Sequence, residues 1–234
     1  YVWDGLVWFY DGIRNVGRNR PHDTTSLDWK NLGSSGAYND LFLQRSNAAG
    51  TSWLTAGSLD IADGWDPGRW TDDGFTFIGK SRFRSVVPVA FGTSYTFQAF
   101  VRASSGYMLS ARAVDCSIFV ASDGSLRWNI QTNETPPRIA GALPHTGYVT
   151  AILDDTDLTA KFFDGITPPA EGVGFKQFDS LDLFSDTAYS IGGAYDPPTG
   201  LNGTIKFFRY YDRVLTDEEL AWRSEEHTSE LQSR

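Results

Sequence analysis

Residues 201–222, LNGTIKFFRYYDRVLTDEELAW, predict a strand that leads into a short capped helix. Asn202-Gly203 is a turn dipeptide, and the side chains that follow it alternate between two faces, as they do along a β-strand. The alternation places Ile205, Phe207, Arg209 and Tyr211 on one face and Lys206, Phe208 and Tyr210 on the other.

The helix after this strand is expected to begin with a capping box. The hydroxyl of Thr216 can accept a hydrogen bond from the amide of Glu219, whose carboxylate can return one. Leu215 and Leu220 flank the box as a hydrophobic staple. We therefore expect a last strand followed by a short C-terminal helix.

The composition favours one large all-β domain over residues 1–222. Aromatic residues make up 15% of the chain, and its 23 glycines and 10 prolines suit many strands joined by tight turns. Two hairpins are expected, with turns at residues 122–125 and 154–157. Strands are predicted at residues 6–10, 75–78, 95–102, 117–121, 126–130, 148–153, 158–163, 188–192 and 203–211.

Several segments in order along residues 1–222 resemble laminin-G-like (concanavalin A-like) domains. Near the beginning, LVWFYDGIRNVG at residues 6–17 precedes TSLDWKNLGSSGAYNDLFL at residues 25–43. Near the end, an I-G-G sequence at 191–193 precedes N-G-x-I at 202–205 and R-x-L-T-x-x-E at 213–219. The resemblance implies an antiparallel jelly-roll β-sandwich, and it implies a family made up mostly of binding modules rather than enzymes.

Residues 223–234 are not expected to belong to the domain. The sequence RSEEHTSELQS at residues 223–233 resembles the translation of a sequencing adapter and has no apolar periodicity. The chain also begins at Tyr1 without a methionine. We therefore expect a fragment whose covalently linked neighbouring domains are missing.

Charge and hydropathy exclude several classes of partner. The formal net charge of −9 at pH 7 argues against nucleic acid, which needs a basic face. No apolar run approaches the roughly 18 residues of a membrane-spanning helix, so membrane insertion is not expected. The single cysteine, Cys116, excludes an intrachain disulfide.

The sequence gives little support to catalysis. Glucanases of the resembling fold use an E-x-D-x-x-E strand, because retaining hydrolysis needs two carboxyls roughly 5–5.5 Å apart. The glutamates before residue 223 are Glu134, Glu171, Glu218 and Glu219, and none belongs to such a motif. His22 and His145 lie in loop-like segments without the spacing that polysaccharide lyases of this fold show. The chain is therefore predicted not to be an enzyme.

Aromatic residues in loops suggest a carbohydrate site. Indole rings stack on the apolar faces of pyranose sugars, and neighbouring polar groups bond the hydroxyls. The alternative is that these large aromatics close the ends of the core. Trp8 and Trp128 lie within predicted strands and are expected in the core. The candidate carbohydrate-binding residues are Trp65, Trp70, Asp66, Arg69, Tyr195 and Trp53.

Two acidic clusters suit Ca²⁺ by composition, since Ca²⁺ prefers hard oxygen ligands. The alternative is ordinary turn chemistry, in which aspartate bonds its own backbone. Neither cluster fits the D-x-D-x-D-G loop. The first contains Asp60, Asp63, Asp66, Asp72 and Asp73, of which Asp60, Asp63, Asp72 and Asp73 are the candidate ligands, and the second contains Asp154, Asp155 and Asp157.

Together these features predict a non-catalytic carbohydrate-binding or adhesive module of a larger extracellular or cell-surface protein. Its expected partner is a glycan or polysaccharide, with Ca²⁺ as a conceivable cofactor. The alternatives are a structural or protein-binding module of a surface adhesin or phage tail, and a divergent carbohydrate-active enzyme.

Overall fold

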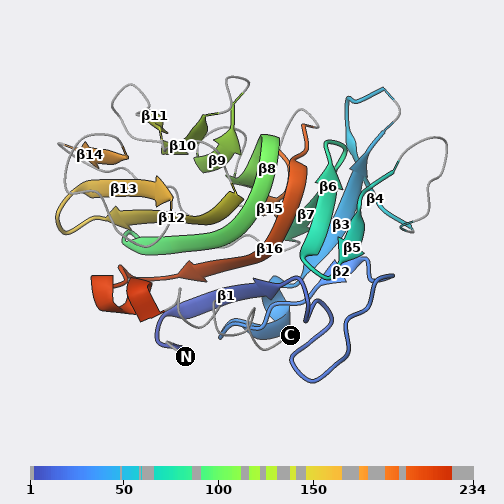
Figure 1. Ribbon diagram of the computed structural model, residues 1–234, viewed down its shortest axis with the longest axis horizontal. Helices are drawn as coiled ribbons and strands as arrows, with labels where there is room; N and C mark the ends of the chain where they lie inside the picture. Colours follow the sequence, from blue (N-terminus) through green and yellow to red (C-terminus); the bar gives the residue numbers. More distant parts are fainter. Residues whose placement is uncertain are drawn as a thin grey trace.

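The computed structural model describes residues 3–47, 49–57, 59, 66–85, 91–111, 116–121, 125–130, 138–140, 146–164, 174–178, 188–194 and 199–222. Strands dominate these ranges, and every pairing between them is antiparallel (Figure 1). Within these ranges one α-helix spans residues 217–222, and a 3-10 turn, η1, spans Gly36–Asn39. The prediction of an all-β antiparallel sandwich with a short C-terminal helix is confirmed.

One layer, sheet A, is built around β16 (Asn202–Tyr211). One edge of β16 pairs with β8 (Tyr95–Ala111), and the other pairs with β6 (Gly74–Ile78) and then β1 (Leu6–Asp11). The strands β12 (Thr146–Asp154), β13 (Thr159–Asp164) and β14 (Phe175–Gln177) extend the sheet beyond β8, and β5 (Arg69–Thr71) extends it beyond β6.

The other layer, sheet B, follows the order β11-β10-β9-β8-β15-β7-β3. Two short strands, β2 and β4, pair with successive parts of the remaining edge of β3. The strands of this sheet are β2 (Asp28–Trp29), β3 (Leu41–Ser46), β4 (Trp53–Thr55), β7 (Ser81–Ser85), β9 (Cys116–Val120), β10 (Leu126–Ile130), β11 (Arg138–Ala140) and β15 (Tyr189–Ile191).

β8 belongs to both sheets and is longer than the predicted strand at 95–102. Its residues up to Ser105 pair with β12 and β16, and those from Gly106 onward pair with β9 and β15 (Figure 1). Gly106 has a φ of +97°, and a Cβ added to it would lie 2.2 Å from the carbonyl oxygen of Gly200. Only glycine fits this corner, because an L side chain is strained at such a φ and would also clash.

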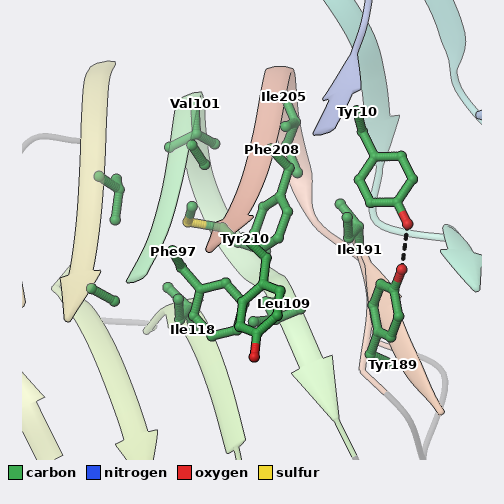
Figure 2. Close-up of a cluster of buried hydrophobic side chains, with 14 of the residues drawn as sticks. Tyr10, Phe97, Val101, Leu109, Ile118, Tyr189, Ile191, Ile205, Phe208 and Tyr210 are labelled. Atoms are coloured by element: carbon green, nitrogen blue, oxygen red, sulfur yellow. Dashed lines mark hydrogen bonds between the residues drawn. The ribbon is translucent and has the colours of Figure 1, made fainter. Parts of the chain in front are cut away.

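The main core fills the space between the sheets. Figure 2 shows Phe97, Phe208 and Tyr210 from sheet A packed toward Leu109 and Ile118 from sheet B. Trp8 stacks on Tyr189 with 4.1 Å between ring centroids. Trp8 and Trp128 are fully buried, which confirms their expected place in the core.

A pair of tyrosine hydroxyls lies inside this apolar core. The hydroxyls of Tyr10 and Tyr189 face each other and are hydrogen-bonded (Figure 2). Tyr10 also donates to the carbonyl oxygen of Asn39 at 2.5 Å, which ties β1 to the end of η1. Burial raises the pKa of both phenols, so the pair stays neutral at physiological pH.

The predicted alternation along β16 is wrong at Ile205 and at Lys206, whose Nζ lies over the ring of Phe100 on the face of Phe207 rather than on that of Phe208. The pairing of β16 with β8 is irregular between Ile205 and Phe207, as at a β-bulge. Ile205 therefore points into the main core with Phe208 and Tyr210, not to the face of Phe207. Because a bulge inserts one extra residue, it reverses the side-chain parity of everything on one side of it. Phe207 and Tyr211 join a second buried cluster that includes Leu215 and Leu220.

Asn31 has a structural role in the segment at residues 25–43, the segment that resembles laminin-G-like domains. Its Oδ1 accepts hydrogen bonds from the amides of Phe9 and Gly33, at 2.8 and 2.9 Å. Its Nδ2 donates to Ser35 Oγ and to the carbonyl oxygen of Gly36. Together with backbone hydrogen bonds from Leu32 to Phe9 and from Ser34 to Leu6, these bonds hold the chain after β2 against the edge of β1.

The capping box at the helix is confirmed. The amide of Glu219 donates to Thr216 Oγ1 at 3.2 Å, and the amide of Thr216 donates to Glu219 Oε2 at 2.9 Å. Arg213 adds a two-pronged ion pair, with Nη1 and Nη2 at 2.9 and 2.7 Å from the two carboxylate oxygens. Leu215 and Leu220 are buried, as the predicted staple requires.

Glu219 should make stability depend on pH in the acid range. Hydrogen bonds from Arg213 hold the pKa of Glu219 at about 2, below its ordinary value of 4.5. Since the folded state has the lower pKa, this stabilisation is complete above pH ~5 and is lost as the pH falls toward 2. Glu219→Gln should therefore lower the free energy of unfolding by about 0.5–1 kcal/mol at pH 7.

Urea unfolding at several pH values measures this effect. The difference between wild type and Glu219→Gln should shrink below pH ~4.5 and vanish near pH 2. Glu218→Gln, a change at an exposed neighbour, is the matched control. A difference that stays constant down to pH 2 would contradict a role for the Glu219 carboxylate.

Candidate functional site

A hollow of about 360 Å³ lies over the outer face of sheet B. On β3, Leu41 and Leu43 point into the core, so the alternate residues Phe42 and Gln44 point outward. The same alternation around the buried Phe83 turns the arginines of β7 outward. The described residues that line the hollow are Phe42, Gln44, Thr55, Arg84 and Ser85.

Strand register brings these side chains together. Phe42 lies opposite Arg84 in the pairing of β3 with β7, and Gln44 lies opposite Arg82. On the other edge of β3, Gln44 lies opposite Thr55 of β4. The lining residues therefore sit on three adjacent hydrogen-bonded strands, which fixes their spacing.

Arg82 holds the polar side of the hollow in place. Its Nε donates to Gln44 Oε1 at 2.9 Å, and its Nη1 donates to the carbonyl oxygen of Ala194 at 2.8 Å. Its guanidinium carbon lies 4.5 Å from the ring centroid of Trp53, so the cation covers one face of the indole. Arg82 is only 2% exposed, and it therefore positions Gln44 and Trp53.

The hollow combines an apolar face with hydrogen-bond donors. The ring of Phe42 is 38% exposed, which is unusual for a phenylalanine in a sheet and offers a flat apolar surface. The amide nitrogen of Gln44 and the guanidinium of Arg84 are donors. None of the described lining residues is acidic, although the whole chain carries a net charge of −9.

Trp70, a predicted carbohydrate-binding residue, is a core residue instead. It is only 5% exposed, and its indole Nε1 donates to the carbonyl oxygen of Ser26 at 2.8 Å. Its ring meets those of Trp29 and Phe75 edge to face, at centroid distances of 5.4 and 4.9 Å. The prediction is corrected for this residue, because neither face of a ring packed in this way can stack on a sugar.

Asp66, Arg69 and Trp53, the other predicted carbohydrate-binding residues that the structure describes, take part in separate contacts. Asp66 and Arg69 pair with each other at 2.7 Å, and Asp66 Oδ1 also accepts the amide of Gly68 in a local turn. Trp53 lies beside the hollow, through its contact with Arg82. Trp65 and Tyr195 lie outside the described residues.

The candidate Ca²⁺ ligands that are described are engaged in turns or ion pairs. Asp72 and Asp73 form the turn between β5 and β6, and Asp73 lies 3.5 Å from Arg102. In the other acidic cluster, Asp154 Oδ1 accepts the amides of the two residues Thr156 and Asp157. Asp60 and Asp63 lie outside the described residues, among which no three acidic, histidine or cysteine side chains gather as for a metal.

Sequence reasoning missed Phe42, Gln44, Thr55, Arg84 and Ser85. The run LFLQRS resembles any half-buried strand, and nothing in the alternation distinguishes an exposed phenylalanine from a core one. Trp53 next to a Gly-Thr-Ser turn was the one signal that pointed to this region.

The comparisons with known proteins concern the fold. No protein-family model matches the chain, and no curated protein matches it. Among solved structures, Trypanosoma rangeli sialidase matches with 16% identity and a TM-score of 0.57, over 92% of this chain and 32% of the sialidase. The same enzyme in complex with sialic acid matches with 16% identity and a TM-score of 0.57, over 93% and 32% of the two chains. A T. rangeli sialidase mutant displaying trans-sialidase activity gives 16% identity and a TM-score of 0.56, over 92% and 32%.

The likeness to these structures is one of fold, whereas the bacterial laminin-G-like assignment stays a prediction. The chain spans about a third of the length of the sialidases that it matches. The prediction of a non-catalytic carbohydrate-binding or adhesive module is contradicted, because the similar structures are those of enzymes that act on carbohydrate. The prediction that the chain is not an enzyme is likewise at odds with them. In the described part of the chain, no helix is long and apolar enough to cross a membrane.

Proposed function

We propose that this chain is the β-sandwich part of a carbohydrate-active enzyme and that the sheet B hollow holds a saccharide of its substrate. The observation that carries the proposal is the hollow itself, in which an exposed phenylalanine stands directly opposite an arginine on adjacent strands. Its volume of about 360 Å³ falls in the range of small-molecule sites, about 300–1,000 Å³.

The lining matches what a pyranose ring presents. The ring has apolar C–H faces that pack against the exposed ring of Phe42, and hydroxyls that bond to Gln44, Thr55 and Arg84. Arg82 keeps Gln44 and Trp53 fixed before any ligand arrives, which reduces the entropy that binding costs.

The hollow binds the saccharide and does not cleave it. Glycoside hydrolysis commonly needs paired carboxyl groups, and none of the described lining residues is acidic. Binding energy from parts of the substrate remote from the reacting bond can still raise the rate of an enzyme. The substrates of the proposed enzyme are extracellular or cell-surface glycans. Sialylated glycans are the first to test, because a similar sialidase was solved with sialic acid.

Phe42→Ala tests the proposal in the full chain. Isothermal titration with a panel of sialylated, uronate-containing and neutral oligosaccharides identifies the ligands that the wild type binds. Loss of the exposed ring should weaken that binding about tenfold, as expected for one lost aromatic stacking contact. Leu54→Ala is the matched control, because Leu54 is also exposed but lies opposite Arg45 rather than among the lining residues.

Two results would overturn the proposal. One is that Phe42→Ala binds as tightly as the wild type, or no more weakly than Leu54→Ala. The other is that no oligosaccharide in the panel binds the wild-type chain. Release of reducing sugar from the same panel, measured in parallel, reports hydrolysis separately from binding.

A further inference from the structure

We infer that Asp28 of β2 is a specificity-determining residue of the sheet B hollow, where it accepts hydroxyl groups of an uncharged sugar unit packed on Phe42. The inference rests on the proposed function, because it assigns a sugar class to the same site. It follows from strand register, from the contacts of the Asp28 carboxylate, and from the chemistry of sugar hydroxyls.

Strand register puts Asp28 beside Phe42 on the outer face of sheet B. In the pairing of β2 with β3, Asp28 lies opposite Phe42, and Trp29 lies opposite Leu41. Trp29 and Leu41 are fully buried in the main core, so the alternate residues Asp28 and Phe42 project to the outer face. Because the Cβ atoms of directly paired residues are roughly 4.5–5.5 Å apart, the carboxylate stands next to the exposed ring.

The Asp28 carboxylate borders the hollow along one edge of β3. β2 and β4 both pair with this edge, and Thr55 of β4, which lines the hollow, lies opposite Gln44. Gln44 is two residues from Phe42 and shares its face, so Asp28 and Thr55 are successive outward side chains beside β3. A sugar ring packed on Phe42 thus has Asp28 within reach of its hydroxyls.

Lys30 holds the Asp28 carboxylate in position. The Nζ of Lys30 donates to Asp28 Oδ2 at 3.2 Å and lies 2.9 Å from Asp40 Oδ2. Asp40 is itself anchored, because its side chain is only 9% exposed and its Oδ1 accepts the amide of Asn31. The ammonium therefore fixes one oxygen of Asp28 before a ligand arrives, which reduces the entropy that binding costs.

The Asp28 side chain keeps acceptor capacity for a ligand. The hydrogen bond from Lys30 occupies one of the about four acceptor positions that a carboxylate offers. The side chain is 35% exposed, so the carboxylate also reaches solvent beside the hollow. A ligand in the hollow can thus donate to Asp28 without displacing Lys30.

The sugar unit that meets Asp28 carries hydroxyls rather than an acid group. An ionised carboxylate only accepts hydrogen bonds, whereas a sugar hydroxyl can donate one, and such a bond is stronger than one between neutral groups. A sugar carboxylate would face a like charge at this position, which disfavours binding. Sialylated glycans contain uncharged units as well, so the inference concerns the unit on Phe42 and not the glycan as a whole.

Matched sugars that differ in charge test the inference. α-1,4-Galactotriose is compared with trigalacturonate, and cellotriose with its triglucuronate counterpart, by isothermal titration into the full chain. In the pair that binds, the uncharged sugar should bind at least about fivefold tighter than the acid. Because the uncharged sugar makes hydrogen bonds rather than ion pairs, its affinity should change less than about twofold between about 0.05 and 0.5 M salt.

Two variants of Asp28 separate its charge from its shape. Asp28→Asn keeps the size of the side chain and the ion pair of Lys30 with Asp40, and it should weaken binding of the uncharged sugar about fivefold and reduce the preference over the acid. Asp28→Ala removes the acceptor and should weaken binding about tenfold. Asp73→Asn is the matched control, because Asp73 is an exposed aspartate paired with Arg102 in the turn between β5 and β6, and it should leave both affinities within about twofold.

The outcomes distinguish this inference from the proposed function. If both Asp28 variants bind the uncharged sugars as tightly as the wild type, or if the wild type prefers the acid of the pair, the inference is wrong, and the weaker binding of Phe42→Ala still supports the glycan site. If none of these sugars and no oligosaccharide of the wider panel binds, the proposed function fails and the inference fails with it. Near-ultraviolet circular dichroism of each variant shows that the fold is kept.

Discussion

Replacing Trp70 with alanine is expected to lower the free energy of unfolding by about 3–5 kcal/mol. The indole is buried between Trp29 and Phe75, and its N–H bonds the carbonyl oxygen of Ser26. The truncation therefore leaves a cavity and also removes the partner of a backbone carbonyl. Urea denaturation followed by tryptophan fluorescence measures the change.

Trp222→Ala is the control for this experiment, because its side chain is 50% exposed. Its effect should stay within about 0.5 kcal/mol, as for most surface substitutions. If Trp70→Ala were as mild as Trp222→Ala and instead abolished glycan binding, Trp70 would be a ligand-binding residue after all.

Gly106→Ala is expected to destabilise the protein by at least about 4 kcal/mol, enough to leave little folded chain. Two costs coincide at this residue. A φ of +97° is unfavourable for any L side chain, and the new methyl group would lie 2.2 Å from the backbone oxygen of Gly200. Because a backbone atom is fixed by its own sheet, the contact cannot be relieved by rotating a side chain.

Gly50→Ala separates these two costs. Gly50 also has a positive φ, +65°, but a Cβ there would meet nothing within 4 Å. Its substitution should cost about 1–2 kcal/mol from backbone strain alone. Thermal unfolding of the two variants compares them directly, and equal melting temperatures would show that the corner at Gly106 is not crowded.

Local patterns predicted much of the fold correctly. β10 has the predicted limits, and the hairpin of β12 and β13 lies within one or two residues of its predicted strands. The Thr216–Glu219 capping box formed as expected, because both of its hydrogen bonds join residues three apart in the sequence. Such features depend on neighbours along the chain, and the sequence contains all of them.

Features set by the partner strand could not be predicted in this way. The irregularity of β16 beside Ile205 arises in its pairing with β8, which is far away in the sequence. The passage of β8 through a corner at Gly106 is imposed by the approach of Gly200. Neither contact changes the alternation of apolar and polar residues along the strand that it affects, so that alternation could not predict it.

The residues of the candidate site show the same difference between features set by sequence neighbours and features set by distant strands. Trp70 follows Asp66-Pro67-Gly68, a sequence typical of a loop. Trp70 nevertheless belongs to β5 and pairs with Phe75 of β6. Conversely, the sequence around Phe42 is typical of an apolar core strand, although the side chain of Phe42 is exposed. Which of the two rings faces solvent is decided by how the sheets stack, and only the three-dimensional structure reveals it.

The pairing of β1 with β16 has a consequence for how the protein is made. β16 is the central strand of sheet A, with β8 along one edge and both β6 and β1 along the other. Leu6 lies opposite Tyr211, so two strands that are far apart in the sequence pair with each other. Contacts of such high sequence separation slow folding. During synthesis sheet A therefore lacks its central strand until β16 has emerged, and the unpaired edges of β1, β6 and β8 are exposed to aggregation for that time.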